Sequence, residues 1–317
     1  MARGVVRRCG PTSKERALVD SERLRLRQFH ERVAGLIPCD PEGARVDLHT
    51  MGLTKLLSHY VNWADRYVAP RPRRVVTWDG FLRHGSTRPD WDAVRALAAK
   101  IEAGNDLKPY LSDKIDRYGY VRPKVQGKDR PRGVEWGDKD YALNAYETHH
   151  LHLNRSGTGL LYVNFSRYDA FLVMVGDHKS FDDGTLAQAV AEARVGTSHE
   201  LQGILGPLRP RTMDEHNRLQ RRGFTTAFSV GGHTVLGAML SRTGTSPLHT
   251  MHADRMIFLI EELDPQIDEP GFGRQWFERN GKAYPATPNF EWMMRSCDLC
   301  LIETTTAFGI PMVEWKR

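Results

Sequence analysis

Residues 148–178 of the 317-residue chain read THHLHLNRSGTGLLYVNFSRYDAFLVMVGDH. Three segments in this stretch are rich in apolar, β-branched and aromatic residues, and we expect each to be a strand: 149–153, 160–165 and 170–175. The connections between them are short and contain Gly, Ser, Asn or Asp, as hairpin connections do. The stretch therefore predicts an antiparallel β-meander.

Apolar residues recur at helical spacing on both sides of the meander. Residues 1–105 predict a helical region, with helices near 12–36, 49–67 and 90–103. Residues 106–200 contain the meander and two flanking helices, near 139–146 and 183–194. Residues 201–317 mix helices near 213–222 and 246–263 with strands near 225–230, 234–240, 290–304 and 310–315. The sequence thus predicts an α+β fold in three successive regions.

The composition is that of a folded protein outside the membrane. Hydrophobic residues make up 40% of the chain and charged residues 26%, which is ordinary for a globular protein. No apolar run approaches the roughly 18 residues that a membrane span requires. The basic N-terminus lacks the apolar stretch of a secretory signal. We expect a cytoplasmic protein with no membrane partner.

The four cysteines are too few for a disulfide framework in a chain of this length. Cys297 and Cys300 have the spacing of a metal knuckle, but a second pair would have to come from Cys9 and Cys39, which a helical segment separates. Because residues 290–302 have the pattern of a strand, alternation would turn Cys297 and Cys300 to opposite faces. We interpret them as buried thiols in a reducing compartment.

The formal charge of +6 and the isoelectric point near 9.2 favour a polyanionic partner such as nucleic acid. Basic residues concentrate in three turn-like or Pro-bearing stretches, at 66–74, 114–132 and 209–222. These stretches are either solvated loops or a rim that contacts phosphates around a cleft. In the second interpretation, the basic residues expected to bind substrate are Lys124, Lys128, Arg130, Arg155 and Arg167.

Histidines are concentrated in the meander. Strand alternation places His150 and His152 on one face with Asn154, and His149 on the other face with Leu151 and Leu153. The third strand lies one strand away from the first and ends at residues 176–179. We therefore expect a cluster at one rim of the sheet, formed by His150, His152, His178 and Lys179.

Such a cluster suits two chemistries, beside a purely structural or binding role. Without a metal, one neutral imidazole can remove the 2′-hydroxyl proton of RNA while a protonated imidazole delivers a proton to the leaving oxygen; a lysine or arginine stabilises the phosphorane charge. Alternatively, His150 and His152 could hold a divalent metal together with Asp177 or His178. The metal would then serve hydrolysis.

A second histidine group comprises His233, His249 and His252. His249 and His252 lie three residues apart on an expected helix and share a face, and His233 follows the pair Gly231-Gly232. These histidines either bind a ligand or cap and pack the fold. The sequence contains no Walker loop, dinucleotide fingerprint, nucleophile elbow or His-Glu-x-x-His helix.

Three strings, LKPYLS from Leu107, DYALNAYETHHLHL from Asp140 and VGDH from Val175, resemble a segment of poorly characterised bacterial proteins associated with toxin-like or phage-defence nucleases. This resemblance implies a small antiparallel sheet with basic and histidine side chains on its concave face. It also implies that the flanking regions of this much longer chain bind a partner, such as an inhibitory protein, or regulate access.

The sequence hypothesis is therefore a nuclease acting on RNA without a cofactor. His150 and His152 are the leading acid/base pair, His178 is a third candidate, and Lys179 and Arg155 stabilise phosphate charge. The alternatives are a non-enzymatic module that binds nucleic acid or protein, and a metal-dependent hydrolase that uses the same histidines.

Overall fold

The computed structural model describes residues 13–40, 42–85, 89–122, 136–154, 159–204, 212–220, 222, 224–241 and 243–315, with side chains from residue 24 onward. Helices and small sheets with mainly antiparallel strands make up the fold, which confirms the α+β class. Among the described helices, none combines the length and apolar character needed to cross a membrane.

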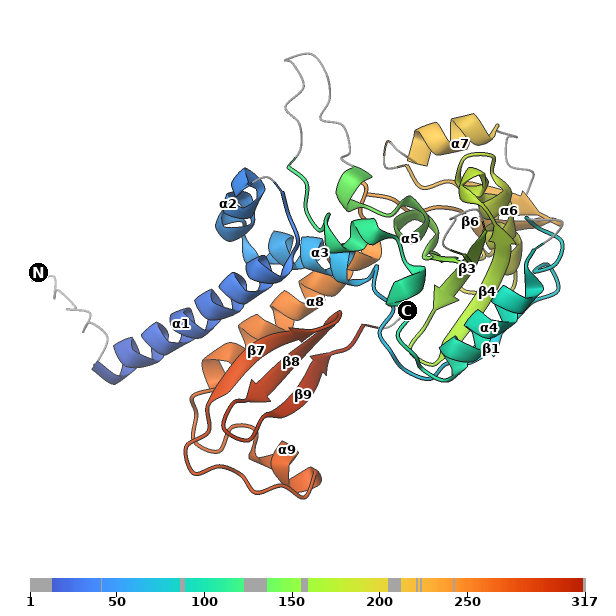
Figure 1. Ribbon diagram of the computed structural model, residues 1–317. Coiled ribbons are helices and arrows are strands. Elements are labelled where there is room, and N and C mark those ends of the chain that lie inside the picture. The colour runs from blue at the N-terminus through green and yellow to red at the C-terminus, as the bar shows by residue number, and fades with distance from the viewer. Residues whose placement is uncertain are drawn as a thin grey trace, which may run out of the picture. The chain divides into compact units, whose positions relative to one another are not determined.

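The predicted meander forms three adjacent strands of a four-stranded sheet (Figure 1). Strands β2 (His149–His152), β3 (Leu160–Phe165) and β4 (Asp169–Gly176) pair in antiparallel order. A short strand that the sequence did not reveal, β1 (Arg74–Val76), adds to β4 in parallel and gives the order β1-β4-β3-β2. The local strand pattern was sufficient to predict the three paired strands.

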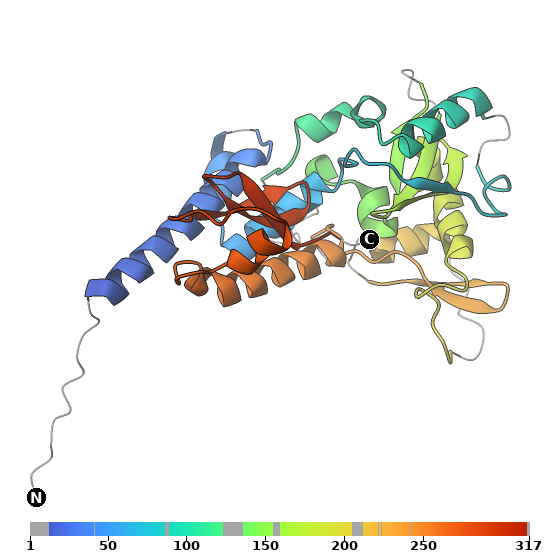
Figure 2. The same cartoon turned by 90° about the horizontal axis from the view of Figure 1, so that it is seen from below.

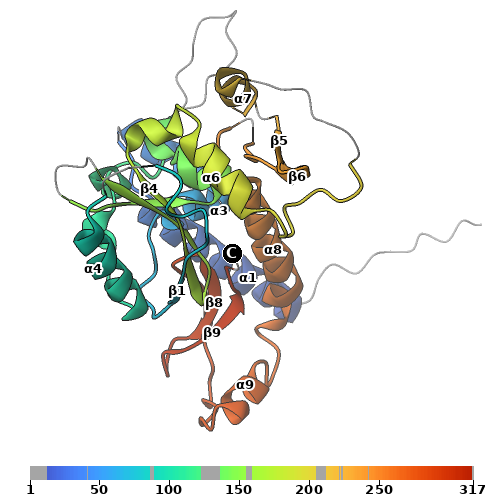
Figure 3. The same ribbon diagram turned by 90° about the vertical axis from the view of Figure 1, so that its right-hand side faces the viewer.

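Helices cover both faces of this sheet. Strand β4 lies between α4 (Trp91–Glu102) and α6 (Thr185–Ala193), as Figures 2 and 3 show. One face packs Leu151, Leu161 and Val163 against α4, and the other packs Leu160, Tyr162 and Met174 against α6 and α5 (Tyr141–Tyr146). Since both faces are covered, the residues of β3 are almost all buried.

Side-chain caps fix the start of the helices next to the sheet. Asp90 precedes α4 and accepts a hydrogen bond from the backbone N–H of Ala93. Asp140 precedes α5 and accepts one from Leu143. Each carboxylate satisfies a backbone donor that has no partner within the helix, which stabilises the helix by about 0.5–2 kcal/mol.

The expected helix at 49–67 is wrong as a single element. It consists of the end of α2 (Glu42–Thr50) and all of α3 (Leu53–Ala64), separated at Met51 and Gly52. Gly52 has an extended backbone and is the N-cap of α3. Apolar residues continue through the break, so their periodicity did not reveal it, whereas glycine's low helix propensity was the available signal.

The chain forms two compact units, each built from segments distant in sequence. The larger unit comprises residues 34–253 and 315–317 and contains the four-stranded sheet. It also contains α7 (Met213–Gln220) and a hairpin of β5 (Ala227–Val230) and β6 (His233–Leu236), where strands were expected. The site described below belongs entirely to this unit.

The smaller unit comprises residues 254–314 and the N-terminal residues up to 33. It contains most of α1 (Ser13–Leu36), the end of α8 (Pro247–Leu263), α9 (Arg274–Arg279) and an antiparallel sheet of β7 (Phe290–Arg295), β8 (Asp298–Glu303) and β9 (Phe308–Val313). The buried Asp264 carboxylate connects α1 and β7 within this unit, because it accepts hydrogen bonds from Arg25 Nε and Trp292 Nε1, each at 2.7 Å.

The expected single strand at 290–304 is also wrong, because β7 and β8 form a hairpin with Ser296 and Cys297 at the turn. Ser296 has a positive φ of 51°, a conformation that glycine or asparagine usually adopts. Because neither residue occurs at this position, the sequence did not reveal the turn. Cys297 therefore lies on the turn and Cys300 on β8. Both thiols are buried and form no disulfide among the described residues, and burial raises the pKa of Cys300.

Candidate functional site

The pairing register brings three histidines to one rim of the four-stranded sheet. His152 lies opposite Leu160, and Leu160 lies opposite Gly176 on the next strand. Adjacent strands are about 4.8 Å apart, so His152 and the end of β4 are separated only by the width of β3. His178 follows two residues after that end, within reach of His150 and His152.

We call His150, His152 and His178 the histidine cluster. Each ring contributes one nitrogen to a group of three atoms that all lie within 4.8 Å of one another. The ring centroids are 5.5 Å apart for His152 and His178, 6.0 Å for His150 and His152, and 6.2 Å for His150 and His178. His150 and His152 are partly buried and His178 is exposed, so the cluster opens to solvent.

A short 3-10 helix, η4 (His178–Phe181), fixes the position of His178. The Asp177 side chain accepts the backbone N–H of Lys179, and the backbone N–H of Asp177 donates to Ser180 Oγ. Tyr162 Oη donates to the Asp177 carbonyl at 2.7 Å, which ties η4 to β3. Asp177 therefore acts as a helix cap, and His178 is the third member of the group that could hold a metal.

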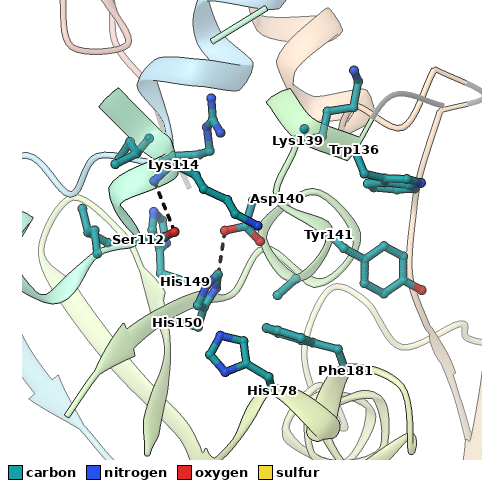
Figure 4. Close-up of a pocket in the computed structure, with 15 residues that line it drawn as sticks. Ser112, Lys114, Trp136, Lys139, Asp140, Tyr141, His149, His150, His178 and Phe181 are labelled. Carbon is teal, nitrogen blue, oxygen red and sulfur yellow. Dashed lines mark hydrogen bonds and ion pairs between the residues drawn. The ribbon is translucent and has the colours of Figure 1, made fainter. Parts of the chain in front are cut away.

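A pocket of about 220 Å³ opens beside the cluster, and His150 and His178 line it (Figure 4). Phe181 packs edge-on against both rings, at centroid distances of 5.3 Å and 6.0 Å. Polar, charged and aromatic side chains complete the lining, among them Arg66, Ser112, Lys114, Trp136, Lys139, Asp140 and Tyr141.

Asp140 was missing from the sequence prediction. Its Oδ2 lies 3.4 Å from Nδ1 of His150, while its Oδ1 caps α5 through the Leu143 N–H (Figure 4). One carboxylate thus caps the helix before β2 and lies beside the first histidine of the cluster, without a hydrogen bond to its Nδ1. An aspartate directly before an expected helix indicates an N-cap, but the distance from Asp140 to His150 depends on tertiary structure.

Burial and like charge lower the pKa of His152 below its usual value near 6.5. Burial is the largest cause, positive charge on His150 and His178 adds to it, and Asp113 opposes it. A histidine in this setting is neutral at pH 7 and can accept a proton.

Of the other predicted site residues, only Lys179 and Arg167 are described, and neither lines the pocket. Lys179 is exposed on η4 and is not among the described residues that line the pocket. Arg167 is in the turn between β3 and β4, at the end of β4 opposite to His178. Arg155, Lys124, Lys128 and Arg130 lie outside the described residues. The cations that line the pocket are Arg66, Lys114 and Lys139.

The second histidine group has structural partners. His249 is fully buried, and its Nε2 lies 2.9 Å from Asp65 Oδ2. The His252 ring packs against Trp315 at 4.6 Å, and Trp315 Nε1 donates to Asp65 Oδ1. His233 is exposed on β6, with Nδ1 2.8 Å from Glu200 Oε1. The structure thus places His233 beside Glu200, apart from the buried pair of histidines on α8.

Comparison of the chain with protein-family models, with curated proteins and with solved structures gives no match.

Proposed function

We propose that the protein is a ribonuclease that cleaves the phosphodiester backbone at the histidine cluster. The observation that carries the proposal is the convergence of three imidazoles, with nitrogens within 4.8 Å of one another, beside a pocket lined by Arg66, Lys114 and Lys139. Imidazoles supply the proton acceptor and donor that RNA cleavage requires near neutral pH, and the cations attract the substrate phosphate.

The environments of the two histidines on β2 suit different roles. His152, whose pKa is lowered, is the general base that takes the proton from the 2′-hydroxyl. The 2′-oxygen attacks phosphorus, the bond from phosphorus to the 5′-oxygen breaks, and His150 donates a proton to that oxygen. Asp140, at Nδ1 of His150, supplies the carboxylate that supports an imidazolium in such a step. His178 contributes charge to the phosphate at the open side.

A cleavage assay on single-stranded RNA with His150→Ala and His152→Ala tests this proposal. We expect each variant to lose about 10²- to 10⁴-fold in rate, the usual contribution of general acid–base catalysis. His233→Ala is the matched control, because His233 is exposed on β6, which belongs to a different sheet. Unchanged cleavage in both variants would remove the cluster from the mechanism. Salt-sensitive RNA binding without turnover would favour the non-enzymatic alternative.

The same geometry favours a second candidate, a metal-dependent hydrolase. Three histidine nitrogens in one small volume form a common ligand set for a divalent metal, and a carboxylate on the outer nitrogen of a ligating histidine is a frequent supporting contact. A bound ion would supply an activated water. Metal analysis of purified protein, and cleavage that stops on chelation and returns with the metal, would favour this candidate over the metal-free one.

A further inference from the structure

The pocket beside the histidine cluster contains more positive than negative charge. Its described lining includes Arg66, Lys114 and Lys139 but a single carboxylate, that of Asp140. The positive charge of Lys139 is neutralised by Asp138, because Lys139 Nζ lies 2.6 Å from that fully buried carboxylate. Arg66 and Lys114 together therefore exceed Asp140 by one charge, which matches the single negative charge of a phosphodiester.

Arg66 is the more unusual of these two cations. It follows the C-cap of α3 and is only 7% exposed, although it lines the pocket. Its Nη2 donates to the Tyr118 carbonyl, but its Nε is buried without a hydrogen-bond acceptor among the described residues. Burial lowers the pKa of Arg66, and Asp140 and Asp138 only partly offset that effect.

A buried guanidinium with an unused N–H is unfavourable, and an anionic oxygen would relieve both the missing hydrogen bond and the uncompensated charge. Arginine suits this task because its fork of donors matches phosphate oxygens. The position of Arg66 in the pocket wall makes a ligand oxygen in the pocket the natural acceptor.

Lys114 approaches from a different element. It lies on η2 (Asp113–Asp116), where its backbone N–H donates to Ser112 Oγ, and its side chain extends across the pocket in the direction of Asp140 (Figure 4). Lys114 is exposed, so its ammonium can meet a ligand at the mouth of the pocket. The pocket thus combines a fixed, buried donor with an exposed cation.

We propose that Arg66 and Lys114 form an anion subsite that binds a backbone phosphate of single-stranded RNA next to the bond cleaved at the histidine cluster. The inference rests on the proposed function for the identity of the ligand. The pocket has a volume of about 220 Å³ and lies between side chains. An unpaired nucleotide can enter it, whereas a stacked duplex cannot.

The test is equilibrium binding of a single-stranded RNA in which every 2′-hydroxyl is methylated, measured at several salt concentrations. This probe retains the phosphates but cannot undergo cleavage through the 2′-oxygen. We expect Lys114→Gln to reduce the slope of log affinity against log salt by about 0.7, the contribution of one contact to a single strand. We expect Arg66→Gln to weaken binding by about tenfold or more, as loss of a charge-assisted hydrogen bond does.

Two variants serve as matched controls. Lys108→Gln removes an exposed cation from the same part of the chain, where Lys108 pairs with Asp116. Arg73→Gln removes a guanidinium that is 8% exposed and hydrogen-bonded to the carbonyls of Ser166 and Ala69. Both should bind the probe as the wild-type protein does. Equal binding by Lys114→Gln and wild type would overturn the subsite, even if Arg66→Gln failed to fold.

The outcome is independent of catalysis. If the wild-type protein cleaves no RNA but binds the probe in a manner that depends on Arg66 and Lys114, the proposed function fails and the subsite stands. If the histidine variants lose cleavage while Arg66→Gln and Lys114→Gln bind and cleave normally, the subsite fails and the proposed function stands. A methylated RNA duplex should bind at least tenfold more weakly than the single strand, and equal binding would contradict the single-strand assignment.

Discussion

Two histidine–aspartate pairs lie in the same unit of this protein, in opposite environments. His150 and Asp140 are 3.4 Å apart at the edge of a pocket, and their side chains are 14% and 17% exposed. His249 and Asp65 are 2.9 Å apart, and their side chains are 0% and 5% exposed. The first pair adjoins two further imidazoles, whereas the Asp65 carboxylate of the second also accepts the indole N–H of Trp315. Access to solvent, rather than residue identity, therefore distinguishes the two pairs.

The largest expected difference between the pairs is in catalysis. His150→Ala should reduce RNA cleavage by about 10²- to 10⁴-fold, because general acid catalysis is lost. His249→Ala should leave the cleavage rate per folded molecule within about threefold of wild type, since His249 is fully buried and is not a member of the histidine cluster. Cleavage rates of both variants, normalised to the folded fraction from circular dichroism, check this prediction. Similar losses in the two variants would remove the distinction between the pairs.

The next difference is in stability, where the variant at His249 should lose more than the variant at His150. His249→Ala should lower the free energy of unfolding by about 3–5 kcal/mol, because the Asp65 carboxylate stays buried after losing a partner. His150→Ala removes a partly exposed ring and should lower it by less than about 1 kcal/mol. Urea unfolding of both variants measures the two values. A His249→Ala protein as stable as wild type would show that the buried pair does not hold the fold.

Substitutions can separate two roles of Asp140, as the cap of α5 and as the carboxylate beside His150. Asparagine caps helices as well as aspartate does, so Asp140→Asn should retain α5 and the melting temperature. Cleavage should still fall on the order of tenfold, a part of the acid–base contribution, because the carboxylate at His150 is gone. Asp140→Ala should lose activity and about 1 kcal/mol of stability. Full activity in Asp140→Asn with normal melting would limit Asp140 to helix capping.

The smallest expected effect is on pH dependence. His152 must be neutral to act as a base, so activity should be present above its lowered pKa and should fall as pH decreases through it. His178→Ala removes one of the positive charges that lower this pKa, so the acidic limb of the rate profile should move to higher pH. A shift to lower pH, or none, in log rate against pH would contradict the assigned base.

The sequence predicted those features of the site that depend on local pattern. Alternation in β2 placed His150 and His152 on one face, and β2, β3 and β4 occupy nearly the expected residues. The position of His178 also followed, because short hairpins place the end of the third strand near the first.

The remaining parts depend on contacts between distant segments. Asp140 is readable as a helix cap, but its approach to His150 requires α5 to pack on the sheet. Arg66 belongs to a basic stretch noted in the sequence, yet its burial in the pocket wall follows from how α3 packs against later segments. His249 contacts Asp65 and Trp315, which are far apart in the sequence and which no local pattern connects.

The most direct test of the central claim is the chemistry of the RNA ends produced by purified protein in the presence of a chelator. Attack by the 2′-oxygen predicts 2′,3′-cyclic phosphate and 5′-hydroxyl ends, formed by wild-type protein and lost in His152→Ala. Absence of cleavage under these conditions, or cyclic phosphate ends produced equally by His152→Ala, would contradict metal-free acid–base catalysis by the histidine cluster.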